Sequence, residues 1–311
     1  MKKFPKTPNT DLVVAVCAVA CMAVESCGHD DYEDEDGTTE EVVVDTSACR
    51  GGDPMTSTTT LMFNGVEFTM VHVPAGTFYM GLQNTDTAAQ NYDIVASAYE
   101  ADVHRVTMSS YAIGETEVTQ GLWQAVVGQT PNAGAKQWSN KRGRGANYPA
   151  YFVSYYDVIN KFLPKLNSAH LLPDGYEFTL PTEAQWEFAA QGGEQPGYMR
   201  FAGSNDIDSV AWWYMNGEQT THEVKTKAPN ALGIYDMTGN LWEWNSDYYD
   251  YYPSGEQTDP TGPEEGVDRV IRGGSYDTGD GRSVIHARVY SDYPASRNEY
   301  LGFRIAVNPT K

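Results

Sequence analysis

The sequence predicts an irregular α+β fold with many loops and a low content of regular secondary structure. Of its 311 residues, 29 are Gly and 12% are aromatic, which favours a loop-rich fold that stacks aromatic side chains. Long heptad patterns are absent, so coiled coils and helical bundles are disfavoured. The length is sufficient for one large domain or two small ones. No Pro/Gly-rich linker divides residues 60–311, and we therefore expect one domain over residues 61–311.

Residues 1–26 have the features of an export signal. Lysines near the N-terminus precede an apolar run over residues 12–24, which is too short to predict a membrane span. The run ends in Val-Glu-Ser-Cys-Gly, which resembles the cleavage site of a bacterial lipoprotein with Cys27 as the lipidated residue. An ordinary secretory signal is the alternative.

Residues 27–60 are expected to be an acidic, disordered tether. Nine acidic residues and no basic residue lie between Asp30 and Asp45, so charge repulsion and low hydrophobicity should keep this stretch extended. An acidic stretch directly after a lipidated cysteine also resembles the surface-export signal of Bacteroidetes lipoproteins. The sequence therefore predicts an exported lipoprotein of the outer membrane or cell surface. A solvated linker with no sorting role is the alternative for this stretch.

The cysteines predict no intramolecular disulfide. Cys17 and Cys21 lie in the expected signal and Cys27 would be lipidated, which leaves Cys49 in the mature chain. No thiol is present from Arg50 to Lys311.

The first elements of the domain are predicted to be strands. Residues 61–80 alternate apolar and polar side chains, and Asn64-Gly65 separates two short strands, which indicates a β-hairpin with a type I′ turn. Residues 104–113 read as a further strand. A helix is expected after residues 117–119.

Two further helices carry N-terminal capping signals. Ser154, with an acidic residue three positions later, begins a helix that Pro164 is expected to kink or shorten. Thr182 with Gln185 repeats this signal, and Gly192-Gly193 should end the second helix. Short strands are expected beyond it, over residues 242–244, 269–273, 283–289 and 302–307.

The charge of the chain excludes some partners. Its 42 acidic residues outnumber 21 Lys and Arg, which gives a net charge of −21. Nucleic-acid binding needs a clustered basic face, and no Lys/Arg-rich run is present. We therefore expect no nucleic-acid partner, and contact with a membrane only through the lipid anchor.

Five segments in a fixed order carry a resemblance to a known family. They are GTFYMG (76–81), EVT (117–119) with Trp123, LPTEAQWEFAA (180–190), NALGIYDMTGNLWEW (230–244), and RGGSY (272–276) closing on GFR (302–304). Over about residues 61–307, the chain resembles the formylglycine-generating enzyme (sulfatase-modifying factor) family. This resemblance implies a C-type-lectin-like α+β fold. It does not imply one activity, because such folds carry oxidases, sulfoxide synthases and binding proteins.

The resemblance also locates a copper site that this sequence lacks. Active members convert a cysteine of sulfatases to formylglycine with oxygen and with copper held by two cysteines that follow the Gly-Gly-Ser-[Tyr/Trp] motif. Here those positions fall on Thr278 and Ser283. Hydroxyl groups do not replace the soft thiolate ligands of Cu(I). Copper is therefore not expected, and the sequence assigns no catalytic residue.

Unlike the copper site, a calcium site of the family has matching ligand positions in this sequence. The resemblance implies side-chain ligands at Asp236 and Glu243 and carbonyl ligands at Gly239 and Leu241, which are the hard oxygen donors that suit Ca²⁺. The alternative is that both carboxylates only form hydrogen bonds within the loop.

Tyrosines suggest a binding surface for an extracellular ligand. A run of tyrosines over residues 247–252 is a candidate binding loop, since Tyr supplies large contact area at low entropic cost; a surface loop without a partner is the alternative. The polar and aromatic segment 283–300 lies where the enzyme family has its active-site groove. Its residue types are also those that adenine-directed mutagenesis produces in variable proteins of diversity-generating retroelements. The predicted ligand contacts are Tyr248, Tyr249, Tyr251, Tyr252, Tyr276, His286, Tyr290 and Tyr293.

Other chemistries have little support. The six histidines show no metal-ligand spacing, and Ser154 and Ser275 lack the Gly-x-Ser-x-Gly context of a nucleophile. Trp186, Trp242 and Trp244 are expected in the core. The leading hypothesis is a binding or accessory module for a protein, peptide or glycan. The alternatives are a copper-independent enzyme that modifies a protein or small thiol, and a structural component of a surface assembly.

Overall fold

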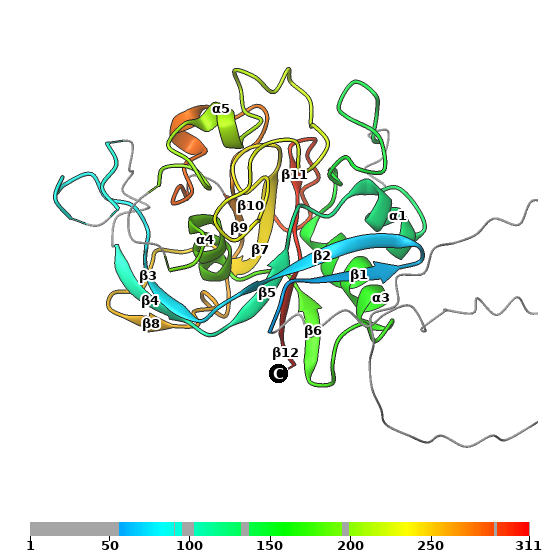
Figure 1. Ribbon diagram of the computed structural model, residues 1–311, viewed down its shortest axis with the longest axis horizontal. Coiled ribbons are helices and arrows are strands. Elements are labelled where there is room, and N and C mark those ends of the chain that lie inside the picture. The colour runs from blue at the N-terminus through cyan, green and yellow to red at the C-terminus, as the bar shows by residue number, and fades with distance from the viewer. Residues whose placement is uncertain are drawn as a thin grey trace, which may run out of the picture. The chain divides into compact units, whose positions relative to one another are not determined.

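The computed structural model describes residues 56–89, 91–94, 103–131, 137–194, 199–288 and 291–310. These residues belong to one compact unit, Asp45–Lys311. The predicted signal peptide, Cys27, the acidic stretch and Tyr290 lie outside the described residues. Within them the chain forms short strands in curled sheets and few helices, which confirms the predicted α+β class (Figure 1). No helix of these ranges combines the length and apolar character needed to cross a membrane.

The largest sheet has five antiparallel strands in the order β1-β2-β5-β12-β6. Their bounds are β1 (Thr59–Phe63), β2 (Val66–Val73), β5 (Tyr111–Gly114), β12 (Ala306–Pro309) and β6 (Tyr176–Thr179). The predicted hairpin is confirmed: Phe63 pairs with Val66 across Asn64 (φ 46°) and Gly65 (φ 76°). A type I′ turn needs positive φ at both central residues, and Asn-Gly adopts it readily.

Two smaller sheets complete the fold. One has the order β10-β9-β7-β11 and the other β3-β4-β8. Their bounds are β7 (Trp242–Tyr248), β9 (Arg269–Arg272), β10 (Ser291–Asp292), β11 (Leu301–Gly302), β3 (Gly76–Met80), β4 (His104–Met108) and β8 (Gln257–Thr258).

Three of the strand predictions need correction. The strand expected over residues 302–307 is divided between β11 and β12, which lie in different sheets, and residues 303–305 belong to neither. The strand expected over residues 104–113 is divided between β4 and β5, which lie in different sheets. The strand expected over residues 283–289 is wrong for the described part, where the short 3₁₀ helix η2 (Asp280–Arg282) leads into turns up to residue 288. The backbone of residues 283–288 forms turn and loop hydrogen bonds instead, with Ile285 N donating to Arg200 O and Ala287 N donating to Val284 O.

The capping predictions are confirmed. Helix α1 (Gln120–Val127) begins after Thr119, whose side chain accepts a hydrogen bond from Leu122 N. Reciprocal capping boxes begin α2 (Tyr155–Asp157) at Ser154 and α4 (Glu183–Gln191) at Thr182. Gly192 ends α4 with a left-handed φ of 92°.

Pro164 does not shorten its helix. The π-helical segment η1 (Val158–Phe162) joins α2 to α3 (Leu163–Asn167), and Leu163 N donates to Val158 O, five residues earlier. This wider turn accommodates a ring that has no N–H to donate. A further short helix, α5 (Ile207–Val210), lies on another part of the domain (Figure 1).

Aromatic side chains fill the core as predicted. Trp186, Trp242 and Trp244 are at most 3% exposed. Trp123 stacks on Phe162 at 5.6 Å between ring centroids, and Phe303 meets both rings edge-on. These contacts join α1, η1 and the segment before β12, so the chain beyond Leu301 is anchored against the first half of the domain.

Candidate functional site

The turn after β9 contains the two positions that the resemblance assigns to copper-binding cysteines. Gly273 (φ 101°) and Gly274 (φ 78°) bend the chain through conformations that favour glycine. A Cβ atom at Gly274 would lie 2.6 Å from Ser283 Oγ. This glycine therefore allows Ser283 to pack directly against the turn.

The hydroxyl groups at these two positions form internal hydrogen bonds. Thr278 Oγ1 accepts from Ser275 N at 3.0 Å and lies 2.9 Å from Ser275 Oγ. Ser283 Oγ donates to Gly279 O at 3.1 Å. Both side chains are buried. The turn thus contains two buried hydroxyls that stabilise its own backbone, and neither is a soft metal ligand.

Exposed side chains next to this turn come from the loop over residues 211–217. Tyr214 N donates to Thr278 O at 3.1 Å, which fixes the loop against the turn. Tyr214 is 59% exposed and Met215 is 71% exposed. The sequence reasoning missed both residues, because their exposure depends on how the loop folds over a distant segment.

The tyrosine run of residues 247–252 is divided between surface and interior. Tyr251 is 70% exposed. The rings of Tyr248 and Tyr249 pack on guanidinium groups, with Arg269 Cζ 3.4 Å from the Tyr248 centroid and Arg288 Cζ 4.4 Å from that of Tyr249. Tyr248 and Tyr249 therefore hold arginine side chains through cation–π contacts. The sequence reasoning did not predict this role.

Three other predicted ligand contacts face inward. The Tyr252 hydroxyl donates to Glu183 Oε1 at 3.3 Å. Tyr276 and His286 are 2% and 1% exposed, and burial raises the pKa of the Tyr276 phenol. Tyr252, which is partly buried, and His286 contact Glu183 and Glu187 of α4, whereas Tyr276 packs in another part of the core beside Tyr151 and Trp244. Tyr293 is 55% exposed, whereas Tyr290 lies outside the described residues.

A buried ion network ties this region to α4. Arg272 Nη1 donates to Glu183 Oε1 at 2.7 Å and its Nη2 donates to Glu187 Oε2 at 2.5 Å. Arg288 Nε donates to Glu183 Oε1 at 2.6 Å, and His286 Nδ1 lies 2.7 Å from Glu187 Oε1. All five side chains are at most 4% exposed. The network fixes β9 and the turn that follows it against the helix.

The network shifts two carboxyl groups in opposite directions. Burial alone would raise the pKa of Glu187, but the charges and hydrogen bonds of Arg272 and His286 lower it to about 2. Burial, with the charge of Glu183, raises the pKa of Asp247 to about 7. The sequence motifs contained Glu187 and Arg272 without assigning them a role. The available sequence signal for the network was the spacing of Glu183 and Glu187, two acids four positions apart on an otherwise apolar helix.

Three of the four predicted calcium ligands, Asp236, Gly239 and Leu241, lie in the turn before β7, and Glu243 lies in β7 itself. Asp236 (φ 57°) and Gly239 (φ 80°) are both buried, and Asp236 Oδ2 accepts from Lys225 N at 2.9 Å. Arg304 donates to both Glu243 oxygens at 2.7 Å, and Trp186 Nε1 donates to Glu243 Oε2. Both carboxylate oxygens of Glu243 thus already accept hydrogen bonds from protein groups.

A third carboxylate, missed by the sequence reasoning, belongs to this turn. Glu117 accepts hydrogen bonds from Leu241 N at 3.0 Å and from Asn240 Nδ2 at 2.8 Å. Burial first, then the charges of Asp236 and Glu243, raises the pKa of Glu117 well above its usual value. Burial likewise raises the pKa of Asp236 to about 6.

These oxygens fit a calcium ion in their chemistry. Burial raises the pKa of Glu117 and Asp236, which both interact with the guanidinium of Arg304, and a hard divalent cation bound here would favour their ionised forms. In the described ranges, no group of three or more His, Cys, Asp or Glu side chains is arranged to hold a metal. The predicted set of two carboxylates and two carbonyls does not require such a group.

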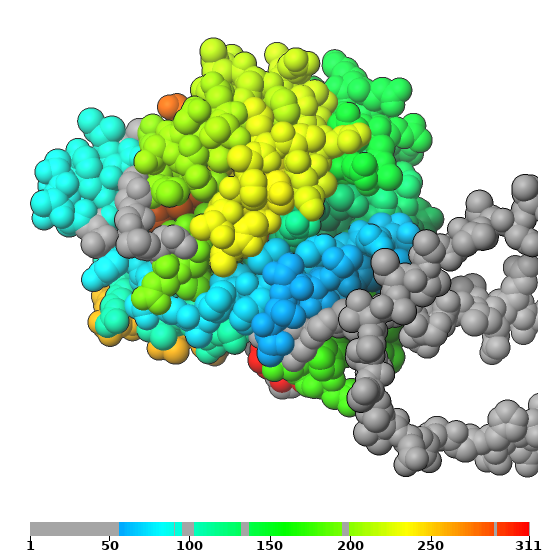
Figure 2. Space-filling view, viewed as in Figure 1, coloured from blue at the N-terminus to red at the C-terminus, as the bar shows by residue number. Residues whose placement is uncertain are grey.

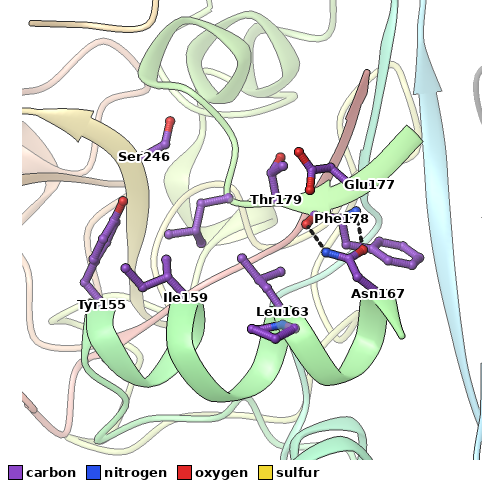
Figure 3. A pocket seen from close by; sticks show the side chains of 10 residues that line it. Tyr155, Ile159, Leu163, Asn167, Glu177, Phe178, Thr179 and Ser246 are labelled. Atoms are coloured by element: carbon purple, nitrogen blue, oxygen red, sulfur yellow. Dashed lines mark hydrogen bonds between the residues drawn. The ribbon is translucent and has the colours of Figure 1, made fainter. Parts of the chain in front are cut away.

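A separate groove lies between the α2–α3 helix and β6 (Figure 3). Its volume is about 490 Å³. Tyr155, Ile159 and Leu163 point from the helix into it, while Glu177 and Thr179 line its other side. None of the predicted site residues lines it.

Comparisons with known proteins agree with this geometry. Residues 63–309 match the family described as "Sulfatase-modifying factor enzyme 1-like domain". The formylglycine-generating enzyme of Streptomyces coelicolor is 31% identical over 301 residues, covering 76% of this chain and 88% of that protein. The chaperone protein LppX of Paenibacillus barcinonensis is 31% identical over 190 residues, covering 45% of this chain and 65% of that protein.

Solved structures share the fold. Treponema denticola variable protein 1 has a TM-score of 0.67 at 31% identity, over 81% of this chain and 99% of that one. PvdO from Pseudomonas aeruginosa has a TM-score of 0.61 at 26% identity, over 77% of this chain and 94% of that one. These similarities confirm the predicted fold and the predicted family.

Proposed function

Because this chain belongs to the family of sulfatase-modifying factor enzyme 1-like domains, we propose that it is a member whose domain works as a ligand-binding or accessory module. The observation that carries the proposal is the chemistry of Thr278 and Ser283, at the positions of the copper-binding cysteines. Cu(I) selects thiolate ligands, and both hydroxyls already stabilise the turn through Ser275 N and Gly279 O. Similarity to proteins of different names supports a fold that hosts more than one function.

The exposed aromatic side chains support a binding role. Tyr251 and Tyr293 remain exposed from the predicted ligand contacts, and Tyr214 and Met215 extend the set beside the Thr278 turn. Tyrosine gives large contact area for little loss of conformational entropy. The proposed ligand is an extracellular protein, peptide or glycan.

The proposal also includes location and cofactor. We infer an exported lipoprotein, lipidated at Cys27 and attached to the outer membrane or cell surface. We further infer one Ca²⁺, held by carboxylate oxygens of Asp236 and Glu243 and carbonyl oxygens of Gly239 and Leu241. When bound, this ion would favour the ionised carboxylates of the turn and stabilise the fold.

Mass spectrometry tests the loss of copper chemistry. The full chain is incubated with Cu(I), oxygen, a reductant and a peptide that carries the cysteine motif of sulfatases. The expected result is an unchanged peptide. Formation of the aldehyde would overturn the proposal and favour the alternative, an oxidoreductase with a non-standard site.

The double variant Thr278→Cys/Ser283→Cys is the matched control. It restores two thiols at the positions in question, so it is expected to compete for Cu(I) with a chromophoric chelator, whereas the unmodified chain does not. A double variant that folds with an unchanged melting temperature and still binds no Cu(I) would contradict the assignment of these positions.

A further inference from the structure

The two outer strands of the five-stranded sheet, β1 and β6, are protected differently. At β6, Asn167 Nδ2 donates to Phe178 O at 2.9 Å, and Phe178 N donates to Asn167 Oδ1 at 2.7 Å (Figure 3). The carboxamide of Asn167 thus forms the hydrogen bonds to the backbone N–H and C=O of Phe178 that a neighbouring strand would otherwise form. Asn167 closes this edge of the sheet.

On the side opposite β2, strand β1 has backbone N–H and C=O groups that point away from the sheet. Phe63 and Val66 flank a two-residue turn and therefore form a hydrogen-bonded pair. Alternation along the strand then directs the N–H and C=O of Thr60 and Met62 away from β2. The side-chain oxygens of Thr60 and Thr69 lie 3.0 Å apart, as expected for a pair of residues without backbone hydrogen bonds to each other.

The composition of β1 favours pairing. Residues 59–63 contain no charged residue and no proline, the usual devices that protect an edge strand. Met62 is 45% exposed, while Leu61 and Phe63 pack against the core with only part of their surface covered. The blue residues of β1 and β2 lie on the face shown in Figure 2.

We propose that β1 is a self-association surface, through which two copies of this chain join their sheets by antiparallel pairing of β1 with β1. In the register that the alternation allows, Leu61 lies opposite its counterpart on the two-fold axis, and Thr60 lies opposite Met62 of the second copy. Each Thr60–Met62 pair exchanges two backbone hydrogen bonds. The pairing also covers the outer sides of Leu61 and Phe63.

The closed β6 edge determines the size of the assembly. The β1 interface is isologous, and a sheet with one open and one closed edge joins a single second copy. A sheet open at both edges would instead continue into longer assemblies. Asn167 therefore makes the expected product a dimer.

Analytical ultracentrifugation of the full chain in a non-denaturing detergent, with bound detergent subtracted, tests the proposal. The expected result is a concentration-dependent dimer. Hydrogen–deuterium exchange at the amides of Thr60 and Met62 should slow as the dimer forms. A monomer at all concentrations would overturn the proposal, even with these amides protected, since a segment of the same chain would then cover β1.

Variants separate this interface from other modes of association. Thr60→Pro removes an outward N–H but no hydrogen bond to β2, and Met62→Lys adds an edge charge; each is expected to weaken the dimer roughly tenfold or more at an unchanged melting temperature. Tyr79→Lys, at a β3 position that is 43% exposed, is the matched control and should leave the dimer intact. Asn167→Ala should produce species larger than the dimer. A dimer that is indifferent to Thr60→Pro and Met62→Lys would refute the β1 interface.

Discussion

The guanidinium of Arg272 and the carboxylate of Glu187 form an ion pair at 2.5 Å, and neither side chain is exposed to solvent. Buried pairs of this kind cost desolvation energy, yet removal of one partner leaves the other charge uncompensated. This asymmetry makes the network around α4 sensitive even to conservative substitution.

Glu187→Gln is expected to lower the free energy of unfolding by about 3–5 kcal/mol, because Arg272 and His286 would lose their shared carboxylate. Urea unfolding followed by circular dichroism measures this change. Glu256→Gln is the matched control, since Glu256 pairs with Arg105 across 3.6 Å at 75% exposure. The control should change stability by less than about 1 kcal/mol. Equal effects of the two variants would contradict a special role for the buried network.

The raised pKa of the Asp247 carboxyl group predicts that the stability of the fold depends on pH. Its pKa is about 7 in the folded chain, against about 4 when unfolded, so its contribution is complete below about pH 4 and is lost as the pH rises through 7. Because asparagine does not ionise, Asp247→Asn removes the loss of stability that occurs as the pH rises. The variant is expected to be on the order of 2 kcal/mol more stable than the unmodified chain at about pH 8, with no such gain at about pH 4. Parallel stability–pH curves for the two proteins would refute the raised pKa.

Gly274→Ala tests the close approach inside the Thr278 turn. The added Cβ would meet Ser283 Oγ at 2.6 Å and would sit at a φ of 78°, so a loss of about 2 kcal/mol or more in unfolding free energy is expected. Gly255→Ala is the control, because its φ of 87° is similar and no atom lies within 4 Å of the added Cβ. The backbone strain is common to both variants, and the difference between them reports the contact.

Calcium removal should lower the melting temperature. At a free Ca²⁺ concentration about 100 times its dissociation constant, binding stabilises the fold by about 2.7 kcal/mol, equivalent to roughly 5–10 °C for a domain of this size. Differential scanning calorimetry with Ca²⁺ or a chelator measures the shift. Asp236→Asn should abolish it, whereas Asp174→Asn, on an exposed residue, should preserve it. A shift of the same size in the Asp236 variant would exclude the proposed ligand set.

The sequence predicted local structure well because the signals span few residues. Thr182 and Gln185 form their capping box within one helical turn, and Asn64-Gly65 fixes its hairpin by backbone conformation alone. Pro164 was expected to kink or shorten its helix. The structure instead continues the helix through Pro164 by way of the π-helical segment before it, whose Phe162 packs against Trp123 and Phe303 from distant parts of the sequence.

The site was harder to predict than the fold. Tyr252, Tyr276 and His286 have the composition of a binding surface. Tyr252 and His286 instead contact Glu183 and Glu187 of α4, and Tyr276 packs into the core beside Tyr151 and Trp244. Burial of a polar aromatic residue depends on which charged groups reach it through the tertiary fold. The sequence contains those groups but does not show their separation in space.

The position of β12 has a consequence for how the chain folds. Val307 pairs with Ala112 of β5 on one side and with Phe178 of β6 on the other, so one of the last strands to be synthesised lies between two earlier ones. Contacts between residues 195 positions apart have a large loop-closure cost and are typical of domains that fold in milliseconds to seconds rather than microseconds. A chain cut before Ala306 would leave β5 and β6 without their common partner. The five-stranded sheet therefore cannot be completed until β12 is available.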